Sequence, residues 1–380
     1  MNDTSPAVAV DTTHTGPQRL MSLDALRGFD MFWIIGADSL VAGLRRLTDS
    51  PLVATLADQL EHAEWEGFRF YDLIFPLFVF LMGASTVFSL SKFKQDGSAS
   101  AAYPRVFRRF VLLYLLGLIY YGGQSRGDDP EMFRYLGVLQ RIALCYLGSA
   151  LLFLHLKTRG LIVACGVLLI GYWALLTFVP VPGHGAGVYE EGQNLTNYLD
   201  AHYLPGFKWD GAWDPEGMLS TLPAVASGLL GVLAGLVIRR EDLAGQRKTL
   251  YLAAVGAACL VAGYAWGVPF PVIKKLWTSS FVLVAGGWSF LLLALFYQII
   301  DVWGIKTWSR PFVWIGMNCM TIYVLGRLCG GYPSLARRVI HAPLETAMGT
   351  WGGLAVAGLG LLVAVAIAWS LYRKRVFFRV

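Results

Sequence analysis

The sequence has few charged residues, few cysteines and no apolar signal-peptide core at its start. Only 15% of its 380 residues are charged and 56% are hydrophobic, a balance well outside that of soluble domains. Its five cysteines all fall inside apolar runs, so disulfides are not indicated and we expect packing roles for them. The first residues are polar, and we expect residues 1–20 to form a flexible cytoplasmic tail.

Motifs for metal and nucleotide chemistry are missing as well. The chain has no HExxH, no CxxC pair, no P-loop and no nucleotide-binding glycine fingerprint, so nothing supports a metal or an NTP. Its net charge of +6 does not predict nucleic-acid binding, because the basic residues flank apolar segments instead of forming one patch. We therefore expect no metal and no nucleic-acid partner, and contacts with membrane lipid.

Apolar runs of about 20 residues, each long enough to cross a bilayer, recur along nearly the whole chain. This repetition excludes a single membrane anchor on a soluble enzyme. It predicts an all-α, polytopic transmembrane helical bundle of about ten spans within one domain, residues 21–380. The predicted spans are residues 23–44, 69–91, 106–122, 135–156, 160–179, 217–238, 249–267, 277–300, 311–329 and 351–372.

The distribution of basic residues predicts the orientation of the bundle. With the N-terminus in the cytoplasm, 18 of the 31 Lys and Arg residues fall in cytoplasmic segments and 11 on the opposite side. This bias favours two cytoplasmic termini, because cytoplasmic loops carry an excess of Lys and Arg.

Charged residues within the first predicted span are the first candidates for function. On one continuous helix, Asp24, Arg27 and Asp38 would share a face, about 16 Å separating the last two. Charges in a span usually face the bundle interior or a wet cavity. The alternative is an Asp24–Arg27 ion pair that only fixes helix packing.

A histidine and a carboxylate flank the start of the second predicted span. His62 stands at the mouth of this span, ten residues before Asp72. The pair supplies a titratable base and a group that orients it, which is what general-base catalysis needs. A histidine that is only part of the polar surface is the alternative.

Arginines elsewhere suggest ligand or ion-pair contacts. Arg141, inside the fourth span, needs a partner, which we expect to be Asp24, Asp38 or an anionic ligand. Three further arginines at the inner mouth of the third span suit phosphate groups, although a topogenic cluster on anionic lipid explains them equally. These are Arg105, Arg108 and Arg109.

Two carboxylates stand at the outer mouth of the sixth span. Asp214 precedes Pro215 in an ordinary helix-start arrangement, and Glu216 follows. Helix capping alone explains Asp214, but both carboxylates are candidates for substrate binding.

Six motifs, in order, resemble the heparan-α-glucosaminide N-acetyltransferase family, which includes bacterial NagX-type members. The likeness covers roughly residues 20–325. The motifs are Ser22–Gly28, His62–Gly67 with Asp72–Pro76, Gly137–Ile142, Asp214–Gly217, Lys275–Ser280 and Gly316–Asn318.

The resemblance implies an enzyme that uses cytosolic acetyl-CoA to acetylate a glucosamine amine on the other side of the membrane. The family's active histidine corresponds to His62, with Asp72 orienting it. In the wider membrane acyltransferase group an Arg is followed eleven positions on by a polar residue, which gives Arg27 and Asp38 along the thioester path. Trp65 would face the apolar side of the sugar.

Two positions depart from the family pattern. Asp38 replaces the Asn or His of relatives and adds a negative charge beside the thioester path. Arg327 stands where relatives can have His, so a second histidine is not expected.

The sequence thus predicts a multi-pass acetyltransferase of the bacterial inner membrane. Acetyl-CoA would be the acyl donor, with its phosphates near the inner arginines and Arg141 assisting, and an amino sugar the acceptor. The alternative from another class is an amino-sugar permease without chemistry, and a structural scaffold is a third reading. The oligomeric state stays open, with a homodimer among the options.

Overall fold

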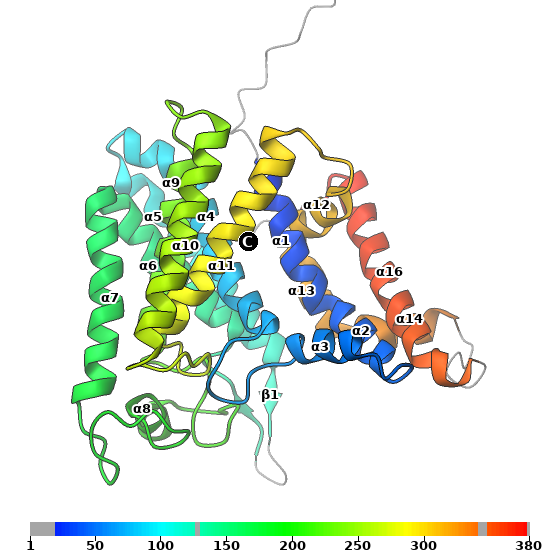
Figure 1. Ribbon diagram of the computed structural model, residues 1–380, viewed down its shortest axis with the longest axis horizontal. Helices are drawn as coiled ribbons and strands as arrows, with labels where there is room; N and C mark the ends of the chain where they lie inside the picture. The colour runs from blue at the N-terminus through cyan, green and yellow to red at the C-terminus, as the bar shows by residue number, and fades with distance from the viewer. Residues whose placement is uncertain (1–19, 126–129, 341–347, 378–380) are drawn as a thin grey trace, which may run out of the picture.

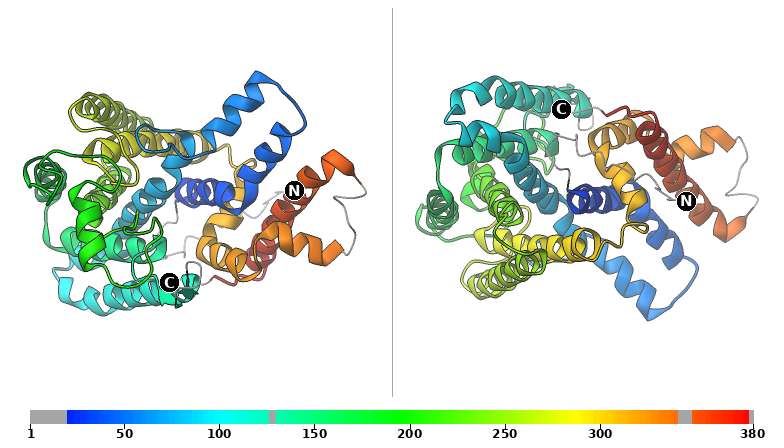
Figure 2. Two further views of the ribbon diagram at one scale, coloured as in Figure 1. Left: turned by 90° about the horizontal axis from the view of Figure 1, so that it is seen from below. Right: turned by 90° about the horizontal axis from the view of Figure 1, so that it is seen from above.

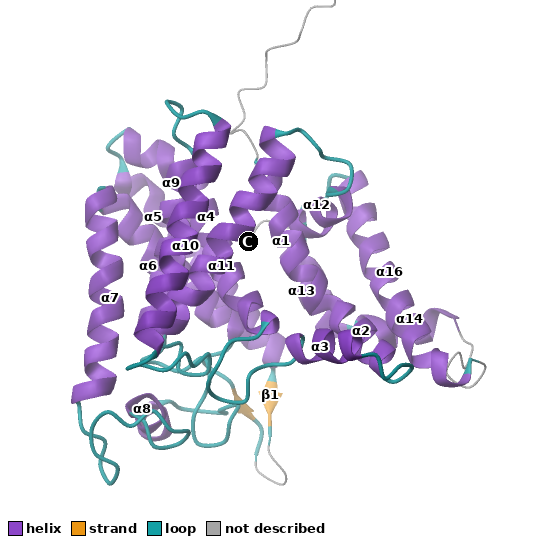
Figure 3. Ribbon diagram, in the orientation of Figure 1, coloured by secondary structure: helices purple, strands orange, loops and turns teal. Residues whose placement is uncertain are grey.

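The computed structural model describes residues 20–125, 130–340 and 348–377. Helical segments run up and down between two faces of a bundle, and the loops of one face form a thick cap (Figures 1 and 3). Residues 1–19 of the predicted tail lie outside the described residues.

Each predicted span corresponds to a helix or to an interrupted pair of helices. In chain order they are α1 (Met21–Phe32) continuing through a π-helical segment (Trp33–Ala37) into α2 (Asp38–Arg45), α4 (Phe70–Gln95), α5 (Ala99–Tyr121), α6 (Val138–His155), α7 (Thr158–Phe178), α9 (Thr221–Ile238), α10 (Gly245–Gly267), α11 (Ser279–Tyr297) with a π-helical end (Gln298–Val302), α12 (Arg310–Met317) with α13 (Cys319–Leu328), and α16 (Gly352–Arg373).

Seven of these segments are long and apolar enough to cross a membrane, judged by length and composition within the described part of the chain. They are α4, α6, α7, α9, α10, α11 with its π-helical end, and α16. The first and ninth segments are interrupted, and α5 carries three arginines. The all-α polytopic class is confirmed, whereas the count of ten spans and the cytoplasmic termini stay predictions.

The first segment is not the continuous helix that the sequence predicted. A π-helical stretch separates α1 from α2, and within it Gly36 adopts a φ of 132°, which a residue with a side chain rarely adopts. This break changes the helical phase, so the prediction that Asp24, Arg27 and Asp38 share one helix face is wrong. Figure 2 shows α2 and α3 (Pro51–Gln59) projecting from the middle of the bundle.

Glycines allow the helices around the centre to approach closely. A Cβ at Gly231 on α9 would lie 1.8 Å from the carbonyl oxygen of Phe80 on α4, and one at Gly28 on α1 would lie 1.7 Å from that of Phe312 on α12. Small residues let backbones touch in this way in membrane bundles, where packing replaces the hydrophobic effect between helices. These contacts hold α9 against α4 and α1 against α12.

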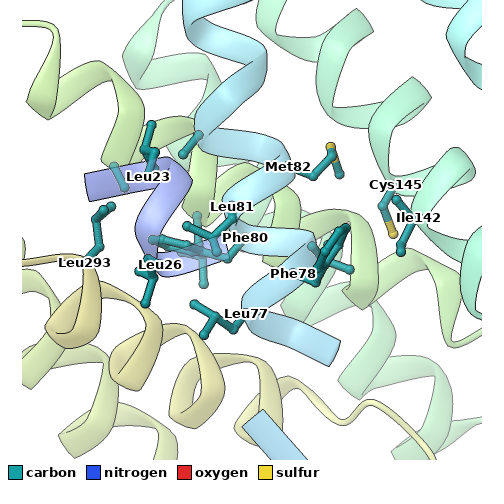
Figure 4. Packing of buried hydrophobic residues seen from close by; sticks show 14 of the residues in the cluster. Leu23, Leu26, Leu77, Phe78, Phe80, Leu81, Met82, Ile142, Cys145 and Leu293 are labelled. Atoms are coloured by element: carbon teal, nitrogen blue, oxygen red, sulfur yellow. The ribbon is translucent and has the colours of Figure 1, made fainter. Parts of the chain in front are cut away.

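Apolar side chains from α1, α4, α6 and α11 fill the interior. In Figure 4, Leu26, Leu77, Phe80 and Leu293 meet where three of these helices come together. All five cysteines are free thiols, and Cys145 is one of the buried packing residues, as the sequence predicted.

Short elements form the cap at the end of the bundle where α4 and α9 begin. They include α3, α8 (Leu195–Tyr203), α14 (Tyr332–Ile340) and a two-stranded antiparallel pair, β1 (Gly123–Gln124) and β2 (Met132–Phe133). Asn194 caps α8 by accepting a hydrogen bond from the backbone N–H of Asn197 at 2.9 Å. The start of α1 and the end of α16 lie at the opposite face (Figure 1).

The predicted orientation can be tested by cysteine labelling. In a chain whose five native cysteines are replaced, we expect single cysteines at Asp58 and Ala186, both exposed in the cap, to react with an impermeant thiol reagent added to intact cells. A cysteine at the exposed Asp242, between α9 and α10, should react only after permeabilisation. Labelling of intact cells only at position 242 would invert the orientation.

Candidate active site

The start of α4 holds a buried carboxylate against a histidine. Asp72 is fully buried at the third position of the helix, and its Oδ1 lies 2.9 Å from Nδ1 of His62. Its Oδ2 accepts hydrogen bonds from the backbone N–H groups of Ala63 and Arg69 at 3.2 and 3.0 Å. The carboxylate therefore fixes the loop before α4 and orients His62, as the ten-residue spacing predicted.

A lysine from a distant part of the chain completes this cluster. The Nζ of Lys274 lies 2.9 Å from Nδ1 of His62 and 3.3 Å from Oδ1 of Asp72. Its loop is joined to the histidine loop by a hydrogen bond from the N–H of Gly67 to the carbonyl of Val272. Two loops more than 200 residues apart in the sequence thus meet at the N-terminus of α4.

One tautomer of His62 keeps Nε2 as the basic ring nitrogen, and the Nζ of Lys274 lies 3.3 Å from this nitrogen. An ammonium only donates hydrogen bonds, so Lys274 and the Nδ1–H of His62 both satisfy the carboxylate of Asp72. The remaining ring nitrogen, Nε2, is then the acceptor that a general base requires. Burial lowers the pKa of Lys274, and the adjacent Asp72 carboxylate only partly opposes this effect.

Sequence reasoning missed Lys274. The motif Lys275–Ser280 begins one residue after it, and as basic residues of an outer loop Lys274 and Lys275 indicate only membrane topology. A pair of lysines in a short loop directly before a span was the available signal, but it does not reveal which partner the fold supplies.

A cavity of about 220 Å³ opens beside this cluster. His62, Tyr71, Glu216 and Lys274 form its polar end, and the ring of His62 lies 4.9 Å from that of Tyr71. The rest is apolar and lies between α1, α4, α6 and α13. It is lined by Met31, Ile34, Ile74, Phe75, Phe78, Val138, Leu139, Ile142, Met320 and Tyr323. An apolar pocket that ends at convergent polar groups is the usual form of a small-molecule site.

Asp214 belongs to a buried ion-pair network and does not cap a helix. Since α9 begins at Thr221, the predicted capping role is wrong. Asp214 instead receives two hydrogen bonds from the guanidinium of Arg134, at 2.7 and 2.8 Å, and one from the backbone N–H of Trp209. It is fully buried and lies outside the cavity lining, so only its neighbour Glu216 reaches the cavity.

Glu216 combines a salt bridge with exposure to the cavity. Its carboxylate pairs with Arg134 at 2.5 Å. Burial nevertheless raises the pKa of Glu216, because it outweighs the attraction of Arg134 and is reinforced by the nearby charge of Asp214. This side chain is therefore a second titratable group at the polar end of the cavity.

Arg141 contacts the start of α9 and neither carboxylate of the first span. Its guanidinium donates to the carbonyl of Gly217 at 3.1 Å and to the hydroxyl of Ser220, and it lies 5.1 Å from the ring of Trp277. The expectation of Asp24 or Asp38 as its partner is wrong, because the turn before α9 is nearer. Two of its nitrogens, Nε and Nη1, have no hydrogen-bond partner among the described residues.

Arg27 and Asp38 occupy different surroundings. Arg27 pairs with Asp24 at 3.1 Å and donates to the hydroxyl of Ser85 on α4 at 2.6 Å, so the ion pair considered for the first span is present. Asp38 lies beyond the π-helical break and accepts a 3.4 Å hydrogen bond from the hydroxyl of Tyr71.

The three inner arginines differ in their surroundings. Arg109 is turned into the bundle, with its guanidinium 4.5 Å from the ring centroid of Tyr146, whereas Arg105 and Arg108 are exposed. Only Arg105 and Arg108 are therefore exposed, and phosphate binding by the three arginines stays a prediction.

Trp65 packs in the cap. Its indole N–H donates to the carbonyl of Tyr189 at 3.0 Å, and its ring meets that of Trp213 edge-on at 5.9 Å. Trp65 does not line the cavity, so the predicted contact of its ring with a sugar would have to occur outside the cavity.

These features define a helical membrane protein with an apolar cavity that has a histidine, a carboxylate and a lysine (His62, Glu216 and Lys274) at its polar end. Residues 19–198 match the family model described as heparan-alpha-glucosaminide N-acetyltransferase, catalytic, a range that contains His62 and Asp72 but not Lys274. The human and mouse heparan-alpha-glucosaminide N-acetyltransferases are each 27% identical to this chain, over 379 and 388 residues respectively.

Both alignments cover 84% of this chain and 56% of the relative. The chain thus spans little more than half the length of the curated relatives it matches. The resemblance seen in the motifs is confirmed: the chain is similar to the heparan-α-glucosaminide N-acetyltransferases.

The ion-pair network should be essential for stability. Replacing Arg134 by Met leaves the carboxylates of Asp214 and Glu216 buried without their cation, which typically costs about 3–5 kcal/mol. We expect a clear fall in the melting temperature of the detergent-solubilised protein. Arg240→Met, which removes an exposed ion pair with Asp242, is the control and should change it little. Equal melting temperatures for the two variants would contradict the assignment.

Proposed function

We propose that the protein is a transmembrane acetyltransferase that moves an acetyl group from cytoplasmic acetyl-CoA to the amine of a glucosamine-type sugar on the periplasmic side of a bacterial inner membrane. The observation that carries the proposal is the contact of His62 with Asp72 and Lys274 at the mouth of the apolar cavity. The names of the human and mouse relatives support the reaction class.

In the proposed reaction His62 acts as the general base. The acceptor amine attacks the thioester carbonyl while Nε2 of His62 takes one of its protons. The C–N bond forms, the C–S bond breaks, and the thiolate of CoA leaves and takes up the proton. Asp72 holds the Nδ1–H and stabilises the imidazolium, and the ammonium of Lys274 offsets the charge of this carboxylate.

The apolar cavity suits the acyl end of the donor. It lies between helices that run toward the predicted cytoplasmic face, where Arg27 and Arg109 occupy the interior. We infer that the pantetheine arm passes these two arginines and that its thioester reaches the cavity beside His62. The bulky, charged part of CoA then stays on the cytoplasmic side, where Arg105 and Arg108 are available to its phosphates.

Replacing His62 tests the proposal most simply. General-base catalysis typically contributes about 10² to 10⁴ in rate, so His62→Ala should lose that factor in acetyl transfer from labelled acetyl-CoA to glucosamine. His184→Ala, an exposed histidine in the cap, is the matched control and should keep wild-type activity. His184→Ala should have the wild-type melting temperature, and His62→Ala should stay folded with a lower one, because it removes one of the partners of the buried Asp72 carboxylate.

Two results would contradict the proposal. Full transfer by a well-folded His62→Ala protein would remove His62 from the mechanism. Passage of unmodified glucosamine across proteoliposomes, with acetyl-CoA neither bound nor consumed, would establish the permease instead.

The pH dependence of transfer should report the charge of Lys274. Because burial lowers its pKa, this lysine loses its proton, as the pH rises, at a lower pH than the usual pKa of about 10.4. Acetyl transfer should decline over the same pH range. Lys274→Arg keeps the cation, so its alkaline decline should move to higher pH. Lys275→Arg, whose lysine pairs with Asp210, should leave the profile unchanged. Identical alkaline limbs in all three proteins would show that the charge of Lys274 is not needed.

A further inference from the structure

A second hollow lies beside the candidate active site. It is a cleft of about 400 Å³ between α2 and α3, lined by polar residues (Asp38, Ser39, Arg45, Arg46 and Glu61) and by apolar ones (Ala42, Ala57 and Leu60). Its volume falls within the range of about 300–1,000 Å³ that small-molecule sites occupy. Unlike the apolar cavity, it offers carboxylates, guanidinium groups and a hydroxyl, a mixture that suits a polyhydroxylated ligand.

The carboxylate of Asp38 lies in this cleft without a cation. It accepts hydrogen bonds from the backbone N–H of Ser39 at 2.7 Å and from the hydroxyl of Tyr71 at 3.4 Å. Within the described residues no Lys, Arg or His nitrogen lies within 4 Å of it. Arg45, in the same cleft, pairs with Asp58 and Glu61 at 3.4 and 3.6 Å instead.

Tyr71 connects the cleft to the reacting groups. Its hydroxyl reaches Asp38, its ring lies 4.9 Å from that of His62, and it also lines the apolar cavity. One side chain thus lines the cavity and contacts Asp38, which lines the cleft. A group held by Asp38 lies next to the proposed base, at the place where a thioester in the cavity would end.

We propose that this cleft is the acceptor site and that Asp38 binds the ammonium group of an amino sugar, an inference that rests on the proposed function. The ring hydroxyls are then bound by Arg46 and Glu61. The ammonium first loses one proton to water, and the neutral nitrogen then attacks the thioester carbonyl while Nε2 of His62 takes a second proton. The C–N bond forms, the C–S bond breaks, and the second proton passes from His62 to the departing thiolate of CoA. The amide product carries no charge, so its attraction to Asp38 is lost and it dissociates.

This assignment gives Asp38 a role in acceptor specificity, whereas the sequence placed it along the donor path. A carboxylate distinguishes an ammonium from both a hydroxyl and an amide at the same ring position. It therefore selects the substrate over its acetylated product and over a neutral sugar.

Binding measured without acetyl-CoA tests the assignment directly. Isothermal titration of the detergent-solubilised full chain with glucosamine should show saturable binding, and glucose and N-acetylglucosamine should bind at least about tenfold more weakly. Asp38→Asn should weaken glucosamine binding by a similar factor. Asp49→Asn, an exposed carboxylate in the loop between α2 and α3, is the matched control and should bind glucosamine as the wild type does.

Kinetics separate this proposal from the proposed function. Asp38→Asn should raise the KM for glucosamine about tenfold with a smaller change in kcat, while its melting temperature without ligand stays at the wild-type value. Wild-type binding and KM in Asp38→Asn would overturn the acceptor site while leaving the acetyltransferase in place. Binding of glucosamine that depends on Asp38, without any acetyl transfer, would support the site and overturn the enzyme.

Discussion

The structure depends on compensating a carboxylate that is fully buried where α4 begins. A buried charge is costly unless it is paired and hydrogen-bonded, and Asp72 meets this condition with two backbone N–H groups, His62 and Lys274. Each partner comes from a segment that must be held in place, so one side chain fixes two loops and the start of a helix. The same contacts orient the histidine on which the proposed chemistry relies.

Several other interior charges are paired or stacked in the same way, whereas the fully buried Asp30 has no hydrogen-bond partner among the described residues. At the cap end, Arg134 compensates Asp214 and Glu216, and only Glu216 reaches the cavity. On the far side of the apolar cavity, Arg27 is paired with Asp24 while Arg109 stacks on Tyr146. An apolar chamber between a polar mouth and two guanidinium groups suits a donor whose reactive end is small and whose other end is anionic.

Much of the fold follows from local sequence, because runs of about 20 apolar residues encode helices wherever they occur. The His62–Asp72 contact was also predictable, since ten residues can form a loop that returns to the next helix. Lys274 and the Arg134–Asp214 pair were not, because 212 and 80 residues separate the partners and only the tertiary fold brings them together. The break after Phe32 escaped prediction since one glycine in an apolar run gives little indication of a π-helical turn.

Acetyl transfer between the two sides of a sealed membrane is the central claim, and proteoliposomes test it most directly. Acetyl-CoA is trapped inside, glucosamine is supplied only outside, and both the acetylated sugar and CoA are measured in each compartment. The account predicts that N-acetylglucosamine forms outside while CoA remains in the lumen. Product that forms only when both substrates share a compartment would contradict it.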